Sequence, residues 1–282
     1  MTAKLESWIG RTEQVHDDLS SWQARAVAAM LDTPSLAPAP GDPLPPLWHW
    51  FYFLGTVPQS RLSTDGHPQR GDFLPPVPQP RRMFAGARMR FHRPLLLGSP
   101  ATRKGTIRDI REKTGRTGNL TFVTVGYEFH QGGELCVEEE QDIVYREPGA
   151  PVPAPEIVEL DPEADGTWWR DVEADSRLLF RFSALTFNAH RIHYDRPYAL
   201  HEEGYPGLVV HGPLTALMLA RLVNDKSDRR IAAFSFRGKA PLFDLGPFRL
   251  VGRPNGNDVD LEVRGPDGKT TQTATAELEP VA

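Results

Sequence analysis

The stretch Asn188-Ala189-His190-Arg191-Ile192-His193-Tyr194-Asp195 is followed, sixteen residues later, by His211-Gly212-Pro213. Four of the nine histidines of this 282-residue chain lie here, within twenty-two residues: His190, His193, His201 and His211. The segment comes after an apolar run, passes through a polar loop and ends at a Gly-Pro step that is typical of a helix start. We expect a catalytic loop that leads into a helix N-terminus.

The helix start predicts a place where negative charge is stabilised. Pro213 suits the first turn of a helix, where a missing N–H costs nothing. The N–H groups near Gly212 and Leu214, with the positive end of the helix dipole, can hold an anion. Gly212 lets a substrate carbonyl approach the backbone. With His193 as a general base nearby, this suits proton abstraction alpha to a thioester, or water addition across a conjugated double bond.

Other interpretations of the same residues stay open at this point. His190, His193, Asp195 and His211 could together form a metal site of the histidine/carboxylate type, although the spacing is loose and we expect no metal. Gly212-Pro213 could start a helix that binds no ligand. His201 is expected to be an ordinary hydrogen-bonding histidine.

Residues Thr186 to Asp195, followed by Ala199, Gly204, Gly207 and His211-Gly212, resemble a known signature loop. It is that of the MaoC-like (R)-specific enoyl-thioester hydratases and dehydratases, of the form Ser-Gly-Asp-x-Asn-Pro-Ile-His-x-Asp with a later His-Gly. The wider chain is most similar to the double hot-dog branch that contains mesaconyl-CoA (3-methylfumaryl-CoA) hydratase, itaconyl-CoA hydratase and the type 2 3-hydroxyacyl-thioester dehydratases. The resemblance is specific over about residues 178–223 and diffuse elsewhere.

The resemblance implies roles for individual residues. His193 falls on the catalytic histidine of the family, Asp195 on the aspartate two residues beyond it, and Gly212, next to His211, on the glycine whose N–H helps to hold the thioester oxygen. Asn188 replaces the catalytic aspartate, and because an amide is no base at neutral pH, Asn188 can only hold a water or orient a partner. The residues expected to contact substrate are Tyr194, Arg191, Arg90 and Arg237.

The resemblance also implies an α+β fold, a double hot-dog in which two curved antiparallel sheets are each wrapped around a helix. We expect residues 1–147 to form a degenerate N-terminal hot-dog domain and residues 157–282 a catalytic C-terminal one. The proline-rich segment 147–156 would be an extended, stiff linker between them. The first half has no counterpart of the histidine loop, so we expect one active site per chain.

Periodicity and turn signals predict the elements of both halves. A helix is expected over residues 12–32, and a second one, with an apolar stripe, over 213–223. Turns are expected at Gly115-Arg116-Thr117-Gly118 and Gly132-Gly133, and a long binding loop or lid over 56–80. Strands are expected over 47–55, 82–91, 102–113, 120–131, 135–146, 178–185, 231–236, 248–253, 258–264 and 271–278.

Composition limits the class of protein. Hydrophobic residues make up 39% and charged residues 24%, which is typical of a globular chain. The formal charge of −5 argues against a protein that coats nucleic acid. The single cysteine excludes an intramolecular disulfide and a thiolate metal site. No signal segment or apolar run of about 20 residues is found, so we expect a cytoplasmic protein without a membrane partner, and a homodimer is left open.

The expected substrate is an acyl-CoA, and no cofactor beyond the coenzyme A of the substrate is expected. We predict a hydro-lyase for a short branched dicarboxylic enoyl-CoA, itaconyl-CoA or mesaconyl-CoA. The alternatives are a fatty-acyl type 3-hydroxyacyl-thioester dehydratase, a thioesterase, and an acyl-thioester binding subunit without activity. Basic clusters at residues 81–93 and 229–239 could bind phosphates, or could be solvated strand edges. A free carboxylate on the acyl group would need a buried arginine.

Overall fold

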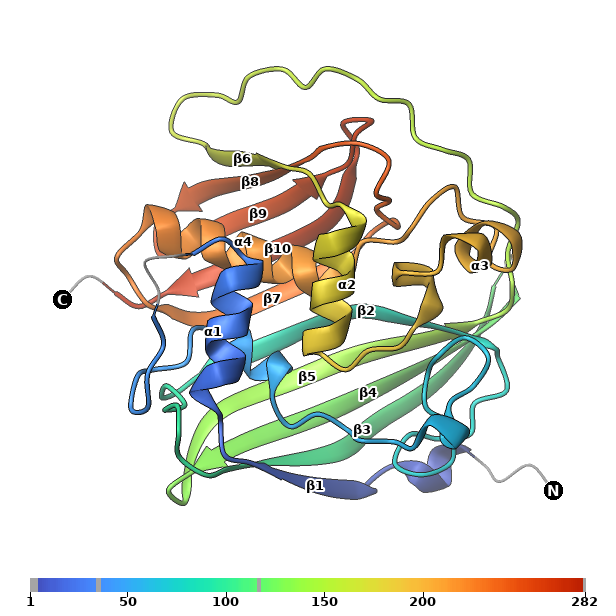
Figure 1. Cartoon of the computed structure of the whole chain (residues 1–282), viewed down its shortest axis with the longest axis horizontal. Coiled ribbons are helices and arrows are strands. Elements are labelled where there is room, and N and C mark those ends of the chain that lie inside the picture. Colours follow the sequence, from blue (N-terminus) through green and yellow to red (C-terminus); the bar gives the residue numbers. More distant parts are fainter. Residues whose placement is uncertain (1–4, 34–36, 116–117, 281–282) are drawn as a thin grey trace. The chain divides into compact units, whose positions relative to one another are not determined.

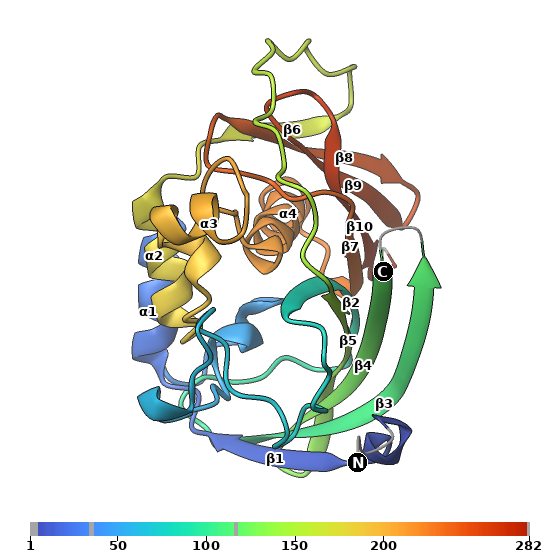
Figure 2. The ribbon, with the colours of Figure 1, turned by 90° about the vertical axis from the view of Figure 1, so that its right-hand side faces the viewer.

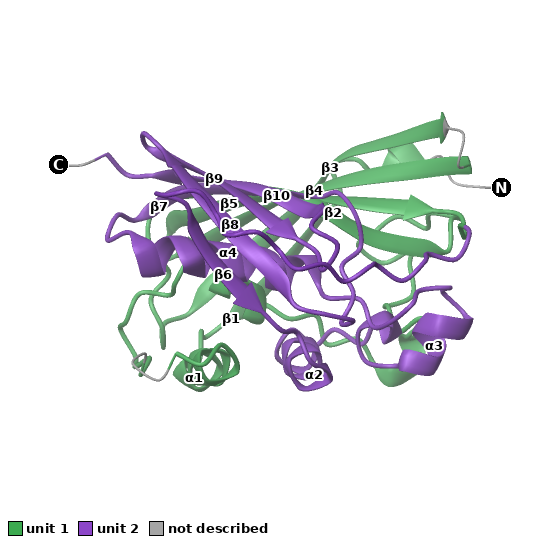
Figure 3. Ribbon diagram, turned by 90° about the horizontal axis from the view of Figure 1, so that it is seen from above, with its two compact units in different colours: residues 1–149 green, residues 150–282 purple. Residues whose placement is uncertain are grey.

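The computed structural model describes residues 5–33, 37–115 and 118–280. The chain divides into two compact units, residues 1–149 and residues 150–282, which Figure 3 colours separately. The division falls inside the proline-rich segment 147–156. This segment has no regular structure, but it is not a bare linker, because the Val152 N–H donates to the Gly204 carbonyl at 2.8 Å.

Unit 1 is built on an antiparallel sheet with the strand order β1-β3-β4-β5-β2. The four later strands confirm the predicted ones and extend them by one to three residues, and Figure 2 shows β3 and β4 as long, curved strands. Part of the predicted turn between them, Arg116-Thr117, lies outside the described residues. The elements are η1 (Leu5–Trp8), β1 (Thr12–Asp17), α1 (Ser21–Met30), η2 (Trp48–Phe51), η3 (Gln59–Arg61), β2 (Arg81–Phe91), β3 (Ala101–Gly115), β4 (Gly118–Gln131) and β5 (Glu134–Arg146).

The start of unit 1 differs from the predicted helix over residues 12–32. Residues 12–17 form a strand that pairs with β3, and their burial alternates from one residue to the next. Leu19 has a φ of 48°, which no α-helix allows. The helix begins at Ser21, after the Ser20 side chain accepts from the Trp22 N–H. Here a strand and a capped helix follow each other, and the apolar residues of both gave one apparent helical pattern.

The strand predicted for residues 47–55 is also wrong. Leu47 and Phe53 have φ values of 70° and 56°, so the chain turns at both ends of the 3-10 helix η2. The aromatic residues of this segment are nevertheless buried, except for the half-buried Trp50, and the His49 ring meets the Phe129 ring of β4 edge-on with centroids 4.8 Å apart. A short 3-10 helix and the loop residues around Val77 thus cover the sheet of unit 1.

Unit 2 repeats the antiparallel plan with the strand order β7-β10-β9-β8-β6. Its central element is α4 (Gly212–Lys226), which contacts all five strands (Figures 1 and 2) and confirms the helix predicted over residues 213–223. Nine of its fifteen residues are buried, because the sheet curves around it. The other elements are β6 (Trp168–Val172), α2 (Ser176–Leu185), η4 (Arg191–His193), α3 (Arg196–His201), β7 (Ile231–Gly238), β8 (Phe248–Asn255), β9 (Asp258–Arg264) and β10 (Thr270–Leu278).

The segment predicted as a strand over residues 178–185 is the helix α2. The Asp175 side chain caps it by accepting from the Leu178 N–H at 2.9 Å. Its buried residues Leu179, Phe182 and Ser183 are three and four positions apart, which is the spacing of one helix face. A short apolar run fits both a strand and a helix, and here the cap decides for the helix.

Candidate active site

The first turn of α4 is held in place by two side chains that the sequence did not single out. The Gly212 carbonyl accepts from Thr215 Oγ1 and from Gln272 Nε2, both at 2.9 Å. Thr215 Oγ1 also lies 3.1 Å from Gln272 Oε1, and both side chains are buried. Because Gln272 comes from β10, the sheet fixes the position of the helix start. Nothing in the local sequence of Gln272 indicates this contact.

The N-terminus of α4 has a backbone N–H, that of Gly212, which no described residue accepts. The first N–H groups of a helix have no intrahelical acceptor, and within the described residues the Gly212 N–H has none elsewhere. A Cβ built on Gly212 would meet a single neighbour, Gln272 Nε2, at 3.7 Å. This geometry and the helix dipole are compatible with an anion held at Gly212, which stays a prediction.

His193 lies beside this helix start with a fixed ring. Its Nδ1 is 2.8 Å from the Val209 carbonyl oxygen, which can only accept, so Nδ1 carries the proton. The neutral ring therefore has its basic lone pair on Nε2. His193 is 8% exposed, and it is the last residue of η4, whose Ile192 carbonyl accepts from the Val209 N–H at 3.0 Å.

The His211 ring stacks on that of His193, with centroids 3.6 Å apart and planes 18° apart. His211 Nε2 is 2.9 Å from Ser183 Oγ, while Nδ1 is buried without a hydrogen-bond partner in the described chain. Burial, and then the nearby His193 and His190, hold the pKa of His211 well below its usual value of 6.5. His211 is accordingly a neutral ring at pH 7.

Asn188 and His190 shape the loop before η4. The Asn188 side-chain oxygen accepts from the His190 N–H at 3.0 Å, and the Asn188 N–H donates to the Ser183 carbonyl at 2.8 Å. The His190 ring meets the His193 ring edge-on, with centroids 5.4 Å apart. Because the oxygen of Asn188 is the acceptor, its NH₂ is the group it can offer to a water.

Asp195 is engaged in contacts within its own loop and at the start of α3. Its carboxylate caps α3 by accepting from the Tyr198 N–H at 3.1 Å, and it pairs with Arg191 at 2.8 Å. The hydrogen bond from Tyr198, and then that from Arg191, lower the pKa of Asp195. The Arg191 guanidinium in turn lies 4.0 Å from the centroid of the Tyr198 ring. The Asp195 carboxylate and the Arg191 guanidinium thus both stabilise the loop.

The other predicted substrate residues lie at the surface. Tyr194 is 46% exposed, and its hydroxyl donates to the Ala189 carbonyl. Arg90 on β2, Arg237 on β7 and His201 at the end of α3 are all exposed. The structure thus brings His193, His211, Gly212 and Asn188 into one region of unit 2, and leaves Arg90 and Arg237 on strand surfaces.

Some members of each basic cluster are paired with acids of their own unit. Arg88 bonds to Glu140 and Asp142, and His92 bonds to Glu138. In unit 2 Arg230 pairs with Glu279. For these paired residues, this favours the interpretation as solvated strand surfaces.

The ring geometry does not favour the metal site left open by the sequence. In-plane nitrogen lone pairs of two stacked rings do not converge on one ion, and His193 Nδ1 and His211 Nε2 are occupied by Val209 and Ser183. Asp195 is engaged by Arg191 and the α3 cap.

Comparison with known proteins gives the family. Residues 47–244 match the model of the hydroxyacyl-thioester dehydratase type 2 family. The chain belongs to this family. It is 67% identical over 277 residues to the mesaconyl-C(4)-CoA hydratase of Chloroflexus aurantiacus, covering 98% of this chain and 99% of that one. The resemblance noted in the sequence and the expectation of a hydro-lyase are thereby confirmed.

Solved structures confirm the hot-dog fold. A MaoC-like dehydratase superposes with a TM-score of 0.70 at 16% identity, over 99% of this chain and 100% of its own. A Mycobacterium tuberculosis protein described as a double hot-dog superposes with a TM-score of 0.59 at 13% identity, over 96% of each chain. Within the described residues, no helix of this family member is long and apolar enough to cross a membrane.

Proposed function

We propose that the chain adds water to the carbon–carbon double bond of mesaconyl-CoA, with His193 as the acid/base residue. The observation that carries this proposal is the hydrogen bond of His193 Nδ1 to the Val209 carbonyl, 2.8 Å long, which directs the basic lone pair to Nε2. The choice of the mesaconyl group is supported by the 67% identical relative, which is a mesaconyl-C(4)-CoA hydratase. Itaconyl-CoA, also considered from the sequence, has no such support.

The reaction needs a base, a place for negative charge and a proton for carbon. His193 Nε2 takes a proton from water while the water oxygen bonds to the carbon β to the thioester. The electrons of the double bond move toward the thioester oxygen, where the Gly212 N–H and the α4 dipole stabilise the charge. The α-carbon then takes this proton back from His193 Nε2, so that the neutral base is restored and both parts of water are added.

His211 and Asn188 assist in different ways. The neutral His211 ring lies flat against His193, so that His193 can take up a proton without a second cation at 3.6 Å. Asn188 cannot be a base, but its NH₂ can hold the oxygen of the attacking water while its carbonyl oxygen fixes the loop through the His190 N–H. We assign Asp195 and Arg191 to holding this loop.

We further propose that coenzyme A, as part of the substrate, is the only cofactor-like group required, because water addition consists of proton transfers and one carbon–oxygen bond. Arg90 and Arg237 are exposed and could meet its phosphates. A cytoplasmic homodimer is part of the same proposal, and light scattering of the purified chain tests the dimer.

The test is turnover of mesaconyl-C(4)-CoA, itaconyl-CoA and crotonyl-CoA side by side, followed by the loss of enoyl-thioester absorbance. We expect the highest kcat/KM with mesaconyl-C(4)-CoA. A chain that releases free CoA thiol would be a thioesterase, and one that binds thioesters without turnover would be a binding subunit. Either result would contradict the proposal.

The second candidate is a dehydratase of longer 3-hydroxyacyl thioesters. The family model favours it, since its description is hydroxyacyl-thioester dehydratase. Faster turnover of 3-hydroxyacyl-CoA substrates of six or more carbons than of mesaconyl-C(4)-CoA would establish this activity.

A further inference from the structure

A row of three residues crosses the sheet of unit 1. Tyr145 on β5 is the register partner of Thr121 on β4 and of Arg82 on β2. Side chains of directly paired residues in an antiparallel sheet lie on the same face. Tyr145 and Thr121 are completely buried and belong to the inner face, so Arg82, which is partly buried, is on that face as well.

The segment 65–80 covers this row. The Arg70 guanidinium lies 4.7 Å from the centroid of the Tyr145 ring, and it donates to the carbonyls of Val77, Gln79 and Pro80. The buried Gln79 side chain accepts from Thr121 Oγ1 at 3.0 Å. The Arg70 guanidinium and the buried Gln79 amide thus fix the segment over the inner face of the sheet.

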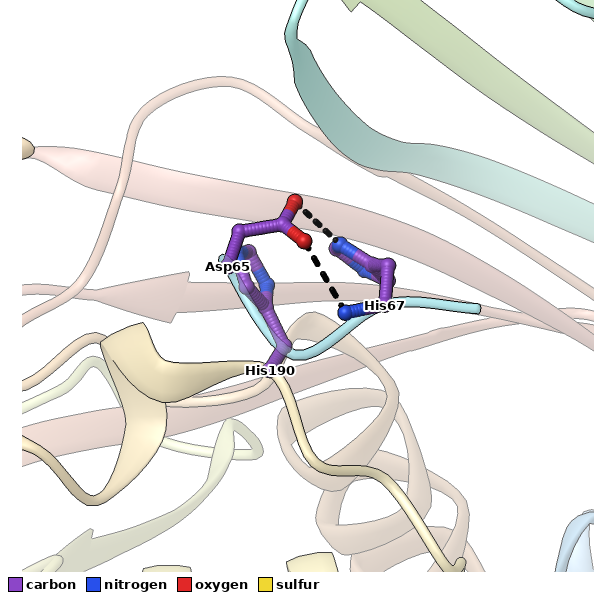
Figure 4. Close-up of side chains that lie close together, drawn as sticks. All are labelled: Asp65, His67 and His190. Atoms are coloured by element: carbon purple, nitrogen blue, oxygen red, sulfur yellow. Dashed lines mark hydrogen bonds and ion pairs between the residues drawn. The ribbon is translucent and has the colours of Figure 1, made fainter. Parts of the chain in front are cut away.

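Asp65 and His67 lie in the same segment and bond to each other twice. The His67 N–H donates to Asp65 Oδ1 at 3.0 Å, and His67 Nδ1 lies 2.9 Å from Oδ2 (Figure 4). Burial lowers the pKa of His67, and the positive charges of Arg82 and Arg70 add to this effect. His67 is therefore uncharged at pH 7, although it has a carboxylate beside it.

Two polar groups of this cluster have no hydrogen-bond partner among the described residues. The Tyr145 hydroxyl is buried without a hydrogen-bond partner in the described chain. The Arg82 guanidinium has no hydrogen bond or ion pair to any described residue. Its positive charge contributes to lowering the pKa values of His67 and Arg70. A buried hydroxyl without a partner has lost its hydrogen bonds to water and gained none in the protein, so such a group calls for a partner.

The charges point to the class of that partner. With His67 neutral, Arg70 and Arg82 stand against the single carboxylate of Asp65, which leaves an excess of one positive charge. A carboxylate, with one charge and two oxygens that a guanidinium binds as a fork, matches this excess. A phosphate monoester carries about 1.5 to 2 negative charges and fits less well.

We propose that Arg82 and the Tyr145 hydroxyl form a carboxylate-binding site in unit 1. The carboxylate could be the free one of the dicarboxylic acyl thioester, which would rest on the proposed function, or that of a separate small acid. Both sources share the same chemistry, and the following experiment distinguishes them.

The first arm measures binding of free mesaconate to the full chain by isothermal titration calorimetry. Arg82→Gln should weaken binding about tenfold or more, the usual loss for a charge-assisted hydrogen bond. Arg81→Gln is the matched control, because Arg81 is the neighbouring strand residue and lies on the opposite face. Tyr145→Phe should also weaken binding, without lowering the melting temperature, since it removes a hydroxyl that has no partner.

The second arm compares kcat/KM for mesaconyl-C(4)-CoA and for crotonyl-CoA, which has no free carboxylate. If the carboxylate is that of the substrate, Arg82→Gln lowers the mesaconyl to crotonyl ratio at least tenfold, and Arg81→Gln leaves it unchanged. If it belongs to a separate acid, the ratio stays constant and only mesaconate binding is lost.

The proposal is overturned if Arg82→Gln changes neither measurement, or if Arg81→Gln changes them equally. Failure of the proposed function is a different result. It would appear as a wild-type chain that hydrates neither thioester, and the calorimetric arm would still decide whether the carboxylate site exists.

Discussion

The rings of His193 and His211 stack with centroids 3.6 Å apart, and only His193 is held by a carbonyl that fixes its tautomer. His211 carries a buried nitrogen without a partner and a pKa well below 6.5. The two histidines therefore differ in what protonation does to them. A proton on His193 is part of the proposed reaction. A proton on His211 would instead place a buried positive charge beside the His193 ring.

His193→Ala should lower kcat by about two to four orders of magnitude, the usual contribution of a general acid/base. The thioester should still bind, because the α4 N-terminus is unchanged. Turnover of mesaconyl-C(4)-CoA and circular dichroism together check this. The exposed His201→Ala is the matched control and should keep wild-type turnover. A His193→Ala variant with near-normal kcat would show that another base is used.

Because of the buried His211, we expect the stability of the folded chain to depend on pH. Its pKa is lower in the folded chain than in the unfolded one, so the unfolded state binds more protons between the two values. Its contribution to the free energy of unfolding is complete above about pH 6.5 and is lost as the pH falls toward the lower, folded value. Urea unfolding at several pH values from 8 to 5 should show a shallower decline for His211→Asn than for wild type. Parallel declines would disprove the assignment.

Gly212→Ala tests the close approach of substrate to the α4 backbone. The new Cβ would meet only Gln272 Nε2 at 3.7 Å, so stability should change by no more than about 1 kcal/mol. The thioester oxygen, in contrast, would be displaced, and kcat/KM should fall about ten- to a hundredfold. Gly207→Ala is the comparison, because its Cβ would lie 2.8 Å from Asp244 Oδ1, and it should lower the melting temperature. Full activity in Gly212→Ala would rule out the backbone oxyanion site.

Asp195 can be assigned to structure or to catalysis by two substitutions. Asparagine keeps a cap acceptor for the Tyr198 N–H, while alanine removes it and should lower the stability. If Asp195 holds the loop, Asp195→Asn retains most of the kcat and Asp195→Ala loses more. A kcat that falls equally and by several orders of magnitude in both variants would instead make the carboxylate a participant in proton transfer.

The buried His49–Glu139 pair should matter for the stability of unit 1. Glu139 is fully buried and bonds to His49 Nε2, Trp50 Nε1 and Gln141 Nε2 at 2.8–2.9 Å. Although burial alone would raise the pKa of Glu139, these hydrogen bonds lower it. His49→Ala should cost about 3–5 kcal/mol, because it leaves a buried charge short of a partner. His92→Ala, which breaks an exposed pair with Glu138, should cost less than about 1 kcal/mol in urea unfolding. Equal losses would contradict this.

The sequence predicted those parts of the fold that depend on local pattern. Strands β2 to β5 and β7 to β10 alternate or lie between turn residues, and α4 has a Gly-Pro start. The segment 178–185 was mistaken for a strand, since its helix depends on the Asp175 cap just outside the apolar run. At residues 47–55 the aromatic composition predicted burial correctly, but the positive φ angles at Leu47 and Phe53 were not visible in the sequence.

The candidate site was predictable only where a motif exists. His193 and Gly212 could be found from their spacing and from the family resemblance. Ser183, Thr215 and Gln272 could not, because each acts through a contact with a residue 3 to 60 positions away that only the folded chain creates. The same holds for Arg82 and Tyr145, whose relation is the register between β2 and β5.

The Val209 carbonyl belongs to the main chain, so no side-chain substitution can delete the group that sets the tautomer of His193. A mutational scan would score position 209 by how its side chain packs and would miss its electrostatic contribution. Replacing the 209–210 peptide bond by an ester weakens the carbonyl as an acceptor and also removes the Val210 N–H that donates to the Leu242 carbonyl at 2.8 Å, so the tautomer of His193 is the property to measure. In this protein the orientation of the proposed base is thus encoded by the path of the backbone and is insensitive to the identity of the residue that supplies the carbonyl.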